Sequence, residues 1–188
     1  MSFNLEKELD KNIAIEQLIS KCERGSVVHQ EMLYKKYYGY ALTVCRLYTY
    51  SNDEAVSILN DSFLKVFTSI EKKRYNRTIP FKNWLRRILI NTAIDHYRKN
   101  IKHLNHLDIE ESNEVFADIN VIDNLNVEDI LSLLDQLPEI QRIVFNLYEI
   151  QGFKHNEISE KLLISESSSR VFLTRAKKKL RVLIGKNF

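Results

Sequence analysis

Residues 155–184 have the sequence HNEISEKLLISESSSRVFLTRAKKKLRVLI. Apolar residues recur at helical spacing on both sides of a three-residue segment, LIS, at 163–165. Two helices joined by three or four residues, the second of them basic, are typical of a helix-turn-helix. From residue 170 to residue 186 there are seven basic groups and no acidic one. This one-sided charge favours nucleic-acid binding over a merely solvated helix.

The second helix of this pair presents a set of side chains outward at intervals of three or four residues. These are Ser167, Arg170, Val171, Thr174, Arg175 and Lys178. Two further helices are predicted upstream. Asn126 can cap the segment VEDILSLLDQL, the chain breaks at Pro138, and PEIQRIVFNLYEIQG ends at Gly152, a residue that suits a helix stop.

The first hundred residues predict a second helical module. Helical spacing of apolar residues indicates helices at about 13–22, 27–50, 51–70 and 80–100. Asp53 and Glu54 lie in the first turn of the third helix, where the helix dipole favours acidic groups. The predicted apolar face of the third helix is Ala55, Ile58, Leu59, Phe63, Val66, Phe67 and Ile70, and that of the fourth is Phe81, Leu85, Ile88, Leu89 and Ile94.

Residues 72–99 combine nine basic groups with one acidic group, interleaved with Tyr75, Phe81, Trp84 and Tyr97. Aromatic rings on an electropositive surface suit single-stranded nucleic acid, because its bases stack on the rings. The same pattern is consistent with buried aromatic rings and solvated cations. The residues alone leave both interpretations open.

Charge divides the chain into three blocks. Residues 1–100 carry a net charge of +6, residues 101–129 one of −7 and residues 130–188 one of +4. Four glycines and two prolines in 188 residues are too few for a turn-rich all-β fold. We therefore expect an all-α protein with two small helical domains, at 1–100 and 126–188, joined by an acidic linker at 101–125.

Several classes of protein are disfavoured. No stretch approaches about 18 consecutive apolar residues, and the first residues lack a basic and then apolar signal segment, so we expect a cytoplasmic protein. Cys22 and Cys45 are too few for a zinc site or a disulfide framework, and we expect them to be buried thiols. His103 and His106 lie near Asp108 without further ligands. We predict no metal and no other cofactor.

Five segments together resemble the sigma-70 family of RNA polymerase sigma factors, in its extracytoplasmic-function subfamily. They are LYKKYYGYAL (33–42), SNDEAVSILNDSFLKVF (51–67), FKNWLRRILINTAIDHYRK (81–99), LDQLPEIQRIVFNLYEIQGFKHNEIS (134–159) and TRAKKKLR (174–181). The resemblance covers nearly the whole chain. It implies a non-enzymatic factor that binds core RNA polymerase and directs promoter-specific initiation of transcription. The implied partners are the β′ clamp and β flap of the polymerase, promoter DNA and an anti-sigma factor.

The resemblance also implies roles for single positions. The helix that docks on the polymerase clamp would use Glu54, Asn60, Asp61 and Phe63. The loop at 72–79 would capture a flipped base, and minus-ten DNA would contact Lys73, Arg74, Asn76, Arg77, Asn83, Trp84, Arg87, Asn91 and Arg98, with Asp95 on the same helix. Minus-thirty-five DNA would contact Ser167, Ser168, Arg170, Val171, Thr174, Arg175 and Lys178.

The chain departs from the family pattern at several positions. Ser57 and Asn60 replace an acidic residue and a glutamine in the docking helix. Lys154 replaces the serine that usually begins the first helix of the helix-turn-helix, and Leu163 replaces the turn glycine. Ser169 replaces a buried valine. We expect these changes to weaken or redirect the electrostatics of docking and to lower the stability of the C-terminal module.

Two alternatives from other classes are open. A stand-alone helix-turn-helix regulator would explain residues 130–188 but leaves the helix around Trp84 and the basic loop without a role. An enzyme would have to use His155, Glu157 or the Asp95–His96 pair, none of which has the spacing of a catalytic triad or a metal site. No glycine-rich phosphate loop is present in the sequence.

Overall fold

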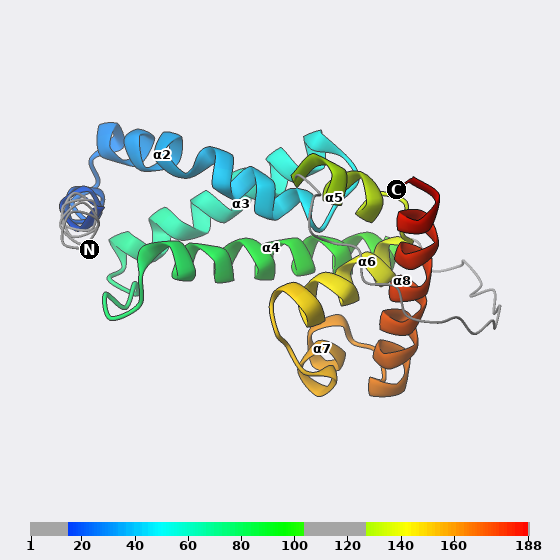
Figure 1. Ribbon diagram of the computed structural model, residues 1–188. Coiled ribbons are helices and arrows are strands. Elements are labelled where there is room, and N and C mark those ends of the chain that lie inside the picture. The colour runs from blue at the N-terminus through cyan, green and yellow to red at the C-terminus, as the bar shows by residue number, and fades with distance from the viewer. Residues whose placement is uncertain (1–14, 104–126, 188) are drawn as a thin grey trace, which may run out of the picture. The chain divides into compact units, whose positions relative to one another are not determined.

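The computed structural model describes residues 15–103 and 127–187, and within these ranges every regular element is a helix (Figure 1). This confirms the predicted all-α class. The elements are a helix at 15–22, α2 (Val27–Arg46), α3 (Asn52–Glu71), α4 (Phe81–His103), α5 (Val127–Leu134), α6 (Glu139–Phe145), the π-helical turn η1 (Asn146–Ile150), α7 (His155–Leu162) and α8 (Glu166–Asn187). Residues 101–103 of the predicted acidic linker are the last residues of α4, and residues 104–125 lie outside the described residues. Asn126, His106 and Asp108 also lie outside them.

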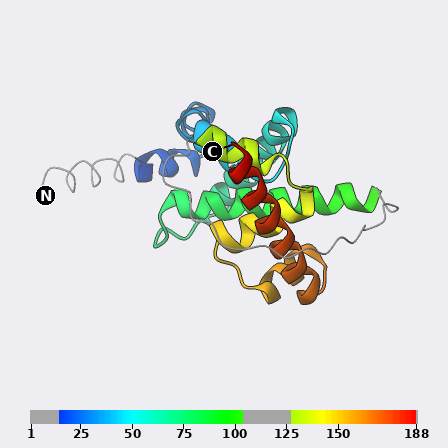
Figure 2. The same ribbon diagram turned by 45° about the vertical axis from the view of Figure 1, so that its right-hand side comes forward.

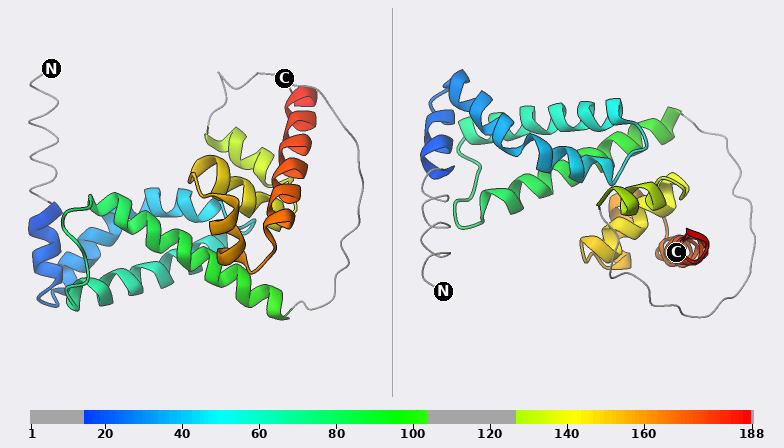
Figure 3. Two further views of the ribbon diagram at one scale, coloured as in Figure 1. Left: turned by 90° about the horizontal axis from the view of Figure 1, so that it is seen from below. Right: turned by 45° about the horizontal axis from the view of Figure 1, so that its top comes forward.

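The chain divides into two compact units, one at 1–45 and 53–93 and the other at 46–52 and 94–188. In the first unit, α2, α3 and α4 run alongside one another, and the helix at 15–22 lies near the loop between α3 and α4 (Figure 3). Buried residues recur at helical spacing. On α3 they include Ala55, Ile58, Leu59, Phe63, Val66 and Ile70, and on α4 Phe81, Leu85, Leu89 and Ile94, as predicted, whereas Phe67 and Ile88 are half-buried.

The second helix ends at Arg46, four residues before the predicted end at Tyr50. Beyond it the side chains of Tyr48 and Thr49 are buried, so the chain leaves the helix to pack them. The turn at 46–52 groups with the second unit. There the carbonyl oxygens of Arg46 and Leu47 accept hydrogen bonds from side chains of α6 and η1 instead of continuing a helix.

The second unit packs α8 against α5, α6 and α7 (Figure 2). Its buried centre contains Leu134, Leu137 and Ala176, with Leu47, Phe145 and Leu180 packed against them. Pro138 precedes α6, as the sequence predicted. The predicted helix that follows instead changes from α6 into the π turn η1 before Gly152, whose φ of +75° suits a residue without a Cβ.

Among the described residues, Arg142 on α6 is the largest fully buried side chain, with 1% of its surface exposed. Its Nε donates to the carbonyl oxygen of Leu47 at 3.0 Å, and its Nη2 donates to that of Arg46. Its Nη1 lies 2.5 Å from the Asp135 carboxylate. A buried charge is tolerated where it is paired and hydrogen-bonded in this way.

Both cysteines are free and buried, as predicted. Burial raises the pKa of the Cys22 thiol to about 11 and that of Cys45 to about 12. A thiol with so high a pKa is protonated at neutral pH and is a poor nucleophile. None of the described helices has the length and apolar character needed to cross a membrane.

Candidate nucleic-acid interface

The start of α8 carries a serine cluster. Ser165 precedes the helix, and its hydroxyl accepts a hydrogen bond from the backbone N–H of Ser168 at 3.0 Å. The same hydroxyl lies 2.8 Å from the hydroxyls of Ser167 and Ser168. Ser165 is therefore the N-cap of α8 and fixes its first turn, a role that the sequence analysis did not assign.

The outward set predicted on α8 divides by exposure. Ser167, Arg170, Val171 and Thr174 are exposed, and Ser168, Arg175 and Lys178 are half-buried. The Arg170 guanidinium pairs with the Glu166 carboxylate at 3.1 Å, and the Thr174 hydroxyl donates to the carbonyl oxygen of Arg170 at 2.9 Å. Relative to Ser167, the other exposed residues lie three, four and seven positions later, so the four form one stripe along the helix.

The turn of the helix-turn-helix contains strained backbone at Leu163, where the family resemblance implies a glycine. Leu163 has φ +57° and ψ +42°, the left-handed region, and 71% of its surface is exposed. A side chain with a Cβ costs free energy in this region. Lys154 at the start of α7 makes no side-chain cap, but its backbone N–H donates to the Glu157 carboxylate at 2.8 Å. One free backbone donor at this helix start is thereby satisfied.

Ser169 is fully buried, as predicted for the position of the family valine, but it has a polar partner. Its hydroxyl lies 2.9 Å from Nδ1 of His155. The His155 ring stacks on Tyr148, with ring centroids 4.6 Å apart. Burial, with Arg170 as the next cause, lowers the pKa of His155. The neutral imidazole is therefore favoured beside Ser169.

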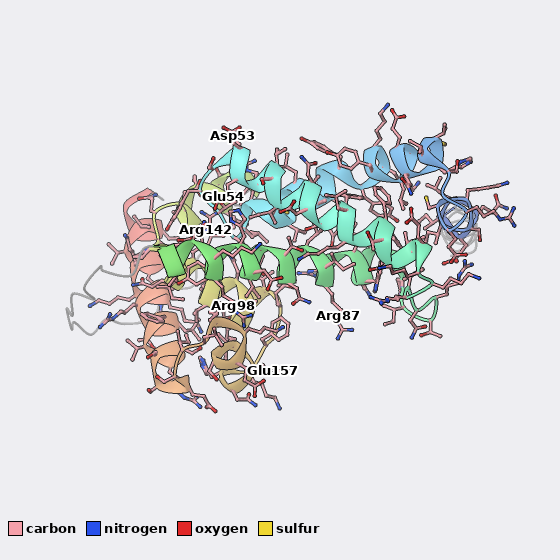
Figure 4. The ribbon with its side chains drawn as sticks, turned by 180° about the vertical axis from the view of Figure 1, so that it is seen from behind. Asp53, Glu54, Arg87, Arg98, Arg142 and Glu157 are labelled. Carbon is pink, nitrogen blue, oxygen red and sulfur yellow. The ribbon has the colours of Figure 1, made fainter. Side chains whose placement is uncertain are left out.

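A second exposed face lies on α4. Asn83, Arg87 and Asn91 are exposed at four-residue intervals, and Trp84 beside them is half-buried. Figure 4 shows Arg87 extending away from the helix. Burial determines which aromatic rings are available to a base. Of the four rings in the basic segment, Trp84 alone is partly accessible, because Tyr75, Phe81 and Tyr97 are buried in the core.

Tyr75, Phe81 and Trp84 form a ring cluster with Tyr37 beneath the exposed face. The ring centroid of Trp84 lies 4.8 Å from that of Tyr75 and 5.7 Å from that of Phe81. The ring centroids of Phe81 and Tyr37 are 5.0 Å apart. Burial raises the pKa of Tyr75 to about 12 and also raises that of Tyr97. Of the two interpretations left open by the sequence, the buried one holds for three of the rings, and Trp84 remains a candidate for stacking.

The loop between α3 and α4 is basic and internally bonded. Lys73 adopts φ +53°, and Lys73, Arg74 and Asn76 are exposed. The Asn76 side chain accepts from the Thr78 backbone N–H at 3.0 Å and from its hydroxyl at 2.8 Å. Arg77 pairs with two carboxylates of the first unit, which the sequence analysis did not foresee.

Arg98, the last predicted minus-ten contact, is half-buried. Its Nη2 donates to the carbonyl oxygen of Glu160 at 3.0 Å, and its Nη1 lies 4.0 Å from the Asp95 carboxylate. Figure 4 labels Arg98 near the end of α4. Arg98, predicted to contact DNA, is thus bonded within the protein. Arg87, another predicted contact on the same helix, is exposed.

The predicted docking positions on α3 do not all lie on one surface. Asn60 and Asp61 are exposed, and Glu54 is half-buried. The prediction that Phe63 contacts the polymerase is wrong. Only 2% of its surface is exposed, and it packs in the core with its ring centroid 4.9 Å from that of Tyr34. Its side chain follows the apolar face of α3 and cannot reach a partner's surface.

The exposed apolar residue on this helix is Leu64, with 66% of its surface accessible. It follows Asp61 by three residues and Asn60 by four, so the three side chains are neighbours. Leu64 was not among the residues predicted for docking. The signal was present, because a leucine that falls off the apolar face of an amphipathic helix is a candidate contact residue.

Groups that could hold a metal do not occur among the described residues, where no cluster of three or more His, Cys, Asp or Glu side chains is found. His103 is at the end of α4, and its predicted companions His106 and Asp108 lie outside the described residues.

Comparison with known proteins gives two family matches. A family model described as Sigma-70 region 2 matches residues 33–102, and one described as Sigma-70, region 4 matches residues 128–180. The first match contains α3, the basic loop and the exposed face of α4. The second contains the helix-turn-helix up to Leu180.

Curated relatives agree over most of their length. RNA polymerase sigma factor SigV of Bacillus subtilis (strain 168) is 31% identical over 139 residues, which are 74% of this chain and 81% of that protein. RNA polymerase sigma factor SigZ of the same organism is 33% identical over 144 residues, which are 71% of this chain and 75% of that protein. The RNA polymerase sigma-H factor of Pseudomonas aeruginosa is 24% identical over 174 residues, 85% of this chain and 89% of that one.

Two solved structures are similar. CnrH in complex with the cytosolic domain of CnrY matches with a TM-score of 0.45 and 20% identity, covering 91% of this chain and 97% of that one. The sigma factor RpoE in complex with the anti-sigma factor NepR from Bartonella quintana matches with a TM-score of 0.49 and 17% identity, covering 84% and 98%. On the evidence of regions 2 and 4 and of the relatives SigV and SigZ, the chain belongs to the sigma-70 family of RNA polymerase sigma factors, in its extracytoplasmic-function subfamily, and it acts in the initiation of transcription.

Proposed function

We propose that this sigma factor binds core RNA polymerase and brings it to promoters through two DNA contacts. Residues 1–100 would dock on the polymerase and bind the melted minus-ten element. Residues 126–188 would bind the minus-thirty-five element as duplex, and the acidic segment at 101–125 would join the two. The observation that carries the proposal is the exposed stripe on α8, at the position that a helix-turn-helix places in the major groove.

The chemistry of that stripe suits base recognition. A guanidinium such as that of Arg170 can donate two hydrogen bonds to a guanine edge. Val171 and the methyl group of Thr174 can contact a thymine methyl group. Ser167 and Ser168 lie in the first turn, where hydroxyl and backbone N–H groups can bind phosphate oxygens. Arg175 and Lys178 would add attraction to the phosphate backbone.

The face of α4 suits a melted strand. Asn83, Arg87 and Asn91 provide exposed polar groups, and the half-buried Trp84 provides an aromatic ring on which an unpaired base could stack. Lys73, Arg74 and Asn76 would border the base pocket in the loop. Extrusion of a base costs a few kcal/mol, which binding in a pocket can offset. The free energy of melting would come from binding, without catalysis by this chain.

Docking on polymerase would use the exposed side of α3. Asp61 supplies charge, and Asn60 is oriented by a hydrogen bond from the Tyr34 hydroxyl at 2.9 Å. Leu64 supplies apolar area next to both. Glu54 would contribute from the first turn. The partner surfaces would be the β′ clamp for this helix and the β flap for the C-terminal unit.

The expected setting follows from these partners. A protein that works on polymerase and chromosomal DNA acts in the cytoplasm, and we place it there. The structural neighbour RpoE was solved with an anti-sigma factor. We propose that an anti-sigma factor also restrains this chain, by covering one of its polymerase-binding surfaces.

The test mixes the purified chain with core RNA polymerase, followed by size exclusion and by transcription from a fragmented genomic template. We expect co-elution and discrete new start sites. Asp61→Arg should weaken both, because it reverses a charge on the docking surface. Lys36→Glu is the matched control, since Lys36 is exposed on α2 about 200° around the helix from Tyr34.

Two outcomes would contradict the proposal. If the chain stays free of polymerase but shifts duplex DNA in a salt-sensitive way, it is a stand-alone regulator. If Lys36→Glu lowers co-elution as much as Asp61→Arg, docking does not use this face of α3.

A further inference from the structure

Arg77 lies in the basic loop between α3 and α4, and its guanidinium joins that loop to the helix at 15–22. Nη1 donates to the Glu16 carboxylate at 3.1 Å, and Nη2 donates to the Glu23 carboxylate at 2.7 Å. Nη2 also lies 3.4 Å from the Ser20 hydroxyl. One side chain thus spans two carboxylates that are seven residues apart on the other segment.

The rest of the loop is ordered by bonds within itself. Tyr75 is buried, and its hydroxyl donates to the carbonyl oxygen of Ile79 at 2.8 Å. The Ile79 N–H donates to the carbonyl oxygen of Asn76 at 3.1 Å, and Asn76 also accepts from Thr78. Residues 75–79 therefore form a compact turn. Arg77 is at the centre of this turn, and its two ion pairs join the turn to Glu16 and Glu23.

These contacts pair the charge of Arg77 with two carboxylates, and 45% of its side-chain surface remains exposed. The hydrogen bond from Arg77 to Glu23, the largest cause, raises the pKa of the guanidinium, and the charge of Glu16 adds to the effect. Two carboxylates beside the guanidinium would repel a DNA phosphate at that place. The neighbouring Lys73 and Arg74 are exposed and are the better phosphate contacts in this loop.

We propose that Arg77 is a positioning residue for minus-ten recognition: through Arg77, Glu16 and Glu23 hold the loop in the shape that receives the flipped base, and Arg77 does not itself bind DNA. This rests on the proposed role of the loop. Arg77 would then not be a DNA contact. It would instead hold Asn76, Lys73 and Arg74 in position. It also gives the helix at 15–22 a part in promoter opening.

The two roles predict opposite results when the carboxylates are neutralised. If Arg77 positions the loop, the double variant Glu16→Gln/Glu23→Gln impairs promoter opening just as Arg77→Ala does. If Arg77 binds phosphate, the double variant releases the guanidinium and leaves opening unchanged or improves it. The double variant also removes two negative charges near DNA, so any nonspecific electrostatic effect would act in the improving direction.

The experiment uses holoenzyme reconstituted from the full chain and core polymerase, on a promoter fragment recovered from the genomic transcription test. Permanganate reactivity of melted thymines measures opening. We expect about a three- to five-fold loss for Arg77→Ala and for the double glutamine variant, the size expected for a weak ion-pair network. Binding of the holoenzyme to a promoter fork that is already unpaired at minus ten should fall by the same factor, because the pocket for the flipped base is itself affected.

A charge exchange separates positioning from a general loss of structure. Arg77→Glu combined with Glu23→Arg should recover part of the opening that Arg77→Glu alone loses. Thermal unfolding of each variant checks that the chain is folded, and Arg24→Gln, a neutralised cation in the turn after the first helix, is the control. Co-elution with core polymerase should be unchanged in every variant.

Loss in both Arg77→Ala and the glutamine variant, with recovery in the exchange, supports the proposal. Loss in Arg77→Ala alone overturns it and returns Arg77 to the DNA contacts. No loss in either variant overturns it as well. If wild-type holoenzyme opens no promoter, the proposed function fails before this comparison begins, so the two failures are distinct.

Discussion

Nδ1 of His155, in the first turn of α7, lies 2.9 Å from the hydroxyl of Ser169, which is fully buried in α8. The pair links the two helices of the helix-turn-helix at a position where the family resemblance implies a valine. A buried hydroxyl costs free energy unless it is hydrogen-bonded, and His155 supplies that partner. The polar substitution is thus compensated rather than simply destabilising.

We expect Ser169→Ala to lower the free energy of unfolding of the C-terminal unit by about 1 kcal/mol, because it leaves a partly buried imidazole nitrogen without its partner. Hydrogen exchange of the α7 and α8 amides in the full chain measures the loss. Ser159→Ala, which removes a hydroxyl bonded only to the carbonyl of Asn156, is the control. Equal protection in Ser169→Ala and wild type would show that the contact contributes nothing.

The same pair predicts a pH dependence. The pKa of His155 is lowered in the folded chain, mainly by burial, whereas the unfolded chain has the ordinary value near 6.5. The unfolded state therefore binds the proton more readily, and stability falls as the pH drops from above 6.5 through the lower folded pKa. The facing charged groups Arg170 and Lys177 act in the same direction, and Glu166 opposes them.

We expect His155→Asn to flatten the change in α7 and α8 amide protection between pH 7.5 and 5.5, after correction for intrinsic exchange. His29→Asn is the control, since His29 belongs to the first unit. A wild-type slope that persists in His155→Asn would assign the acid sensitivity to other groups.

The sequence predicted those features that depend on local pattern. The apolar spacing of α3, the breaks at Pro138 and Gly152 and the helix-turn-helix pair all follow from residues near one another in the chain. Features that depend on distant partners were missed. The end of α2 at Arg46 depends on buried side chains and on Arg142, 96 residues away, and the ion pairs of Arg77 depend on Glu16 and Glu23.

The candidate site shows the same limit. A family motif gives a position but not the direction of its side chain. Phe63 matches the docking motif, yet the period of α3 turns it into the core and leaves Leu64 outside. Three of the four aromatic rings in the basic segment are likewise buried, which charge and composition alone did not distinguish.

The turn residue Leu163 predicts a stabilising substitution. Leu163→Gly should raise the free energy of unfolding of the C-terminal unit by about 1 kcal/mol, because glycine adopts φ +57° without the strain of a Cβ. The exposed leucine side chain gives up little packing. Leu163→Ala keeps the Cβ and should bring no gain. If alanine protects the α7 and α8 amides as well as glycine does, the effect comes from removing an exposed apolar side chain and not from the backbone.

Phe63 and Leu64 are adjacent in sequence and should respond in opposite ways. Phe63→Ala should lower stability by about 3–5 kcal/mol, since it removes a core ring. Leu64→Ser should leave thermal unfolding nearly unchanged and weaken the complex with core polymerase roughly ten-fold, because apolar area buried on docking is lost. Titration of core polymerase with labelled chain measures the affinity. Leu64→Met is the conservative control, and a full-affinity Leu64→Ser would exclude this residue from the docking surface.

Arg170 is the strongest candidate for base recognition, because its guanidinium is exposed and is held only by Glu166 on the same helix. Arg170→Ala in the holoenzyme should cost about 1–3 kcal/mol of promoter binding and should relax the preference at one minus-thirty-five base pair. Lys179 is exposed about 180° around α8 from Arg170, so Lys179→Ala should leave that preference intact. Competition binding with promoters changed one base pair at a time measures both. A uniform loss across all sequences would make Arg170 a phosphate contact, and an equal loss in Lys179→Ala would remove the stripe on α8 from the reading face.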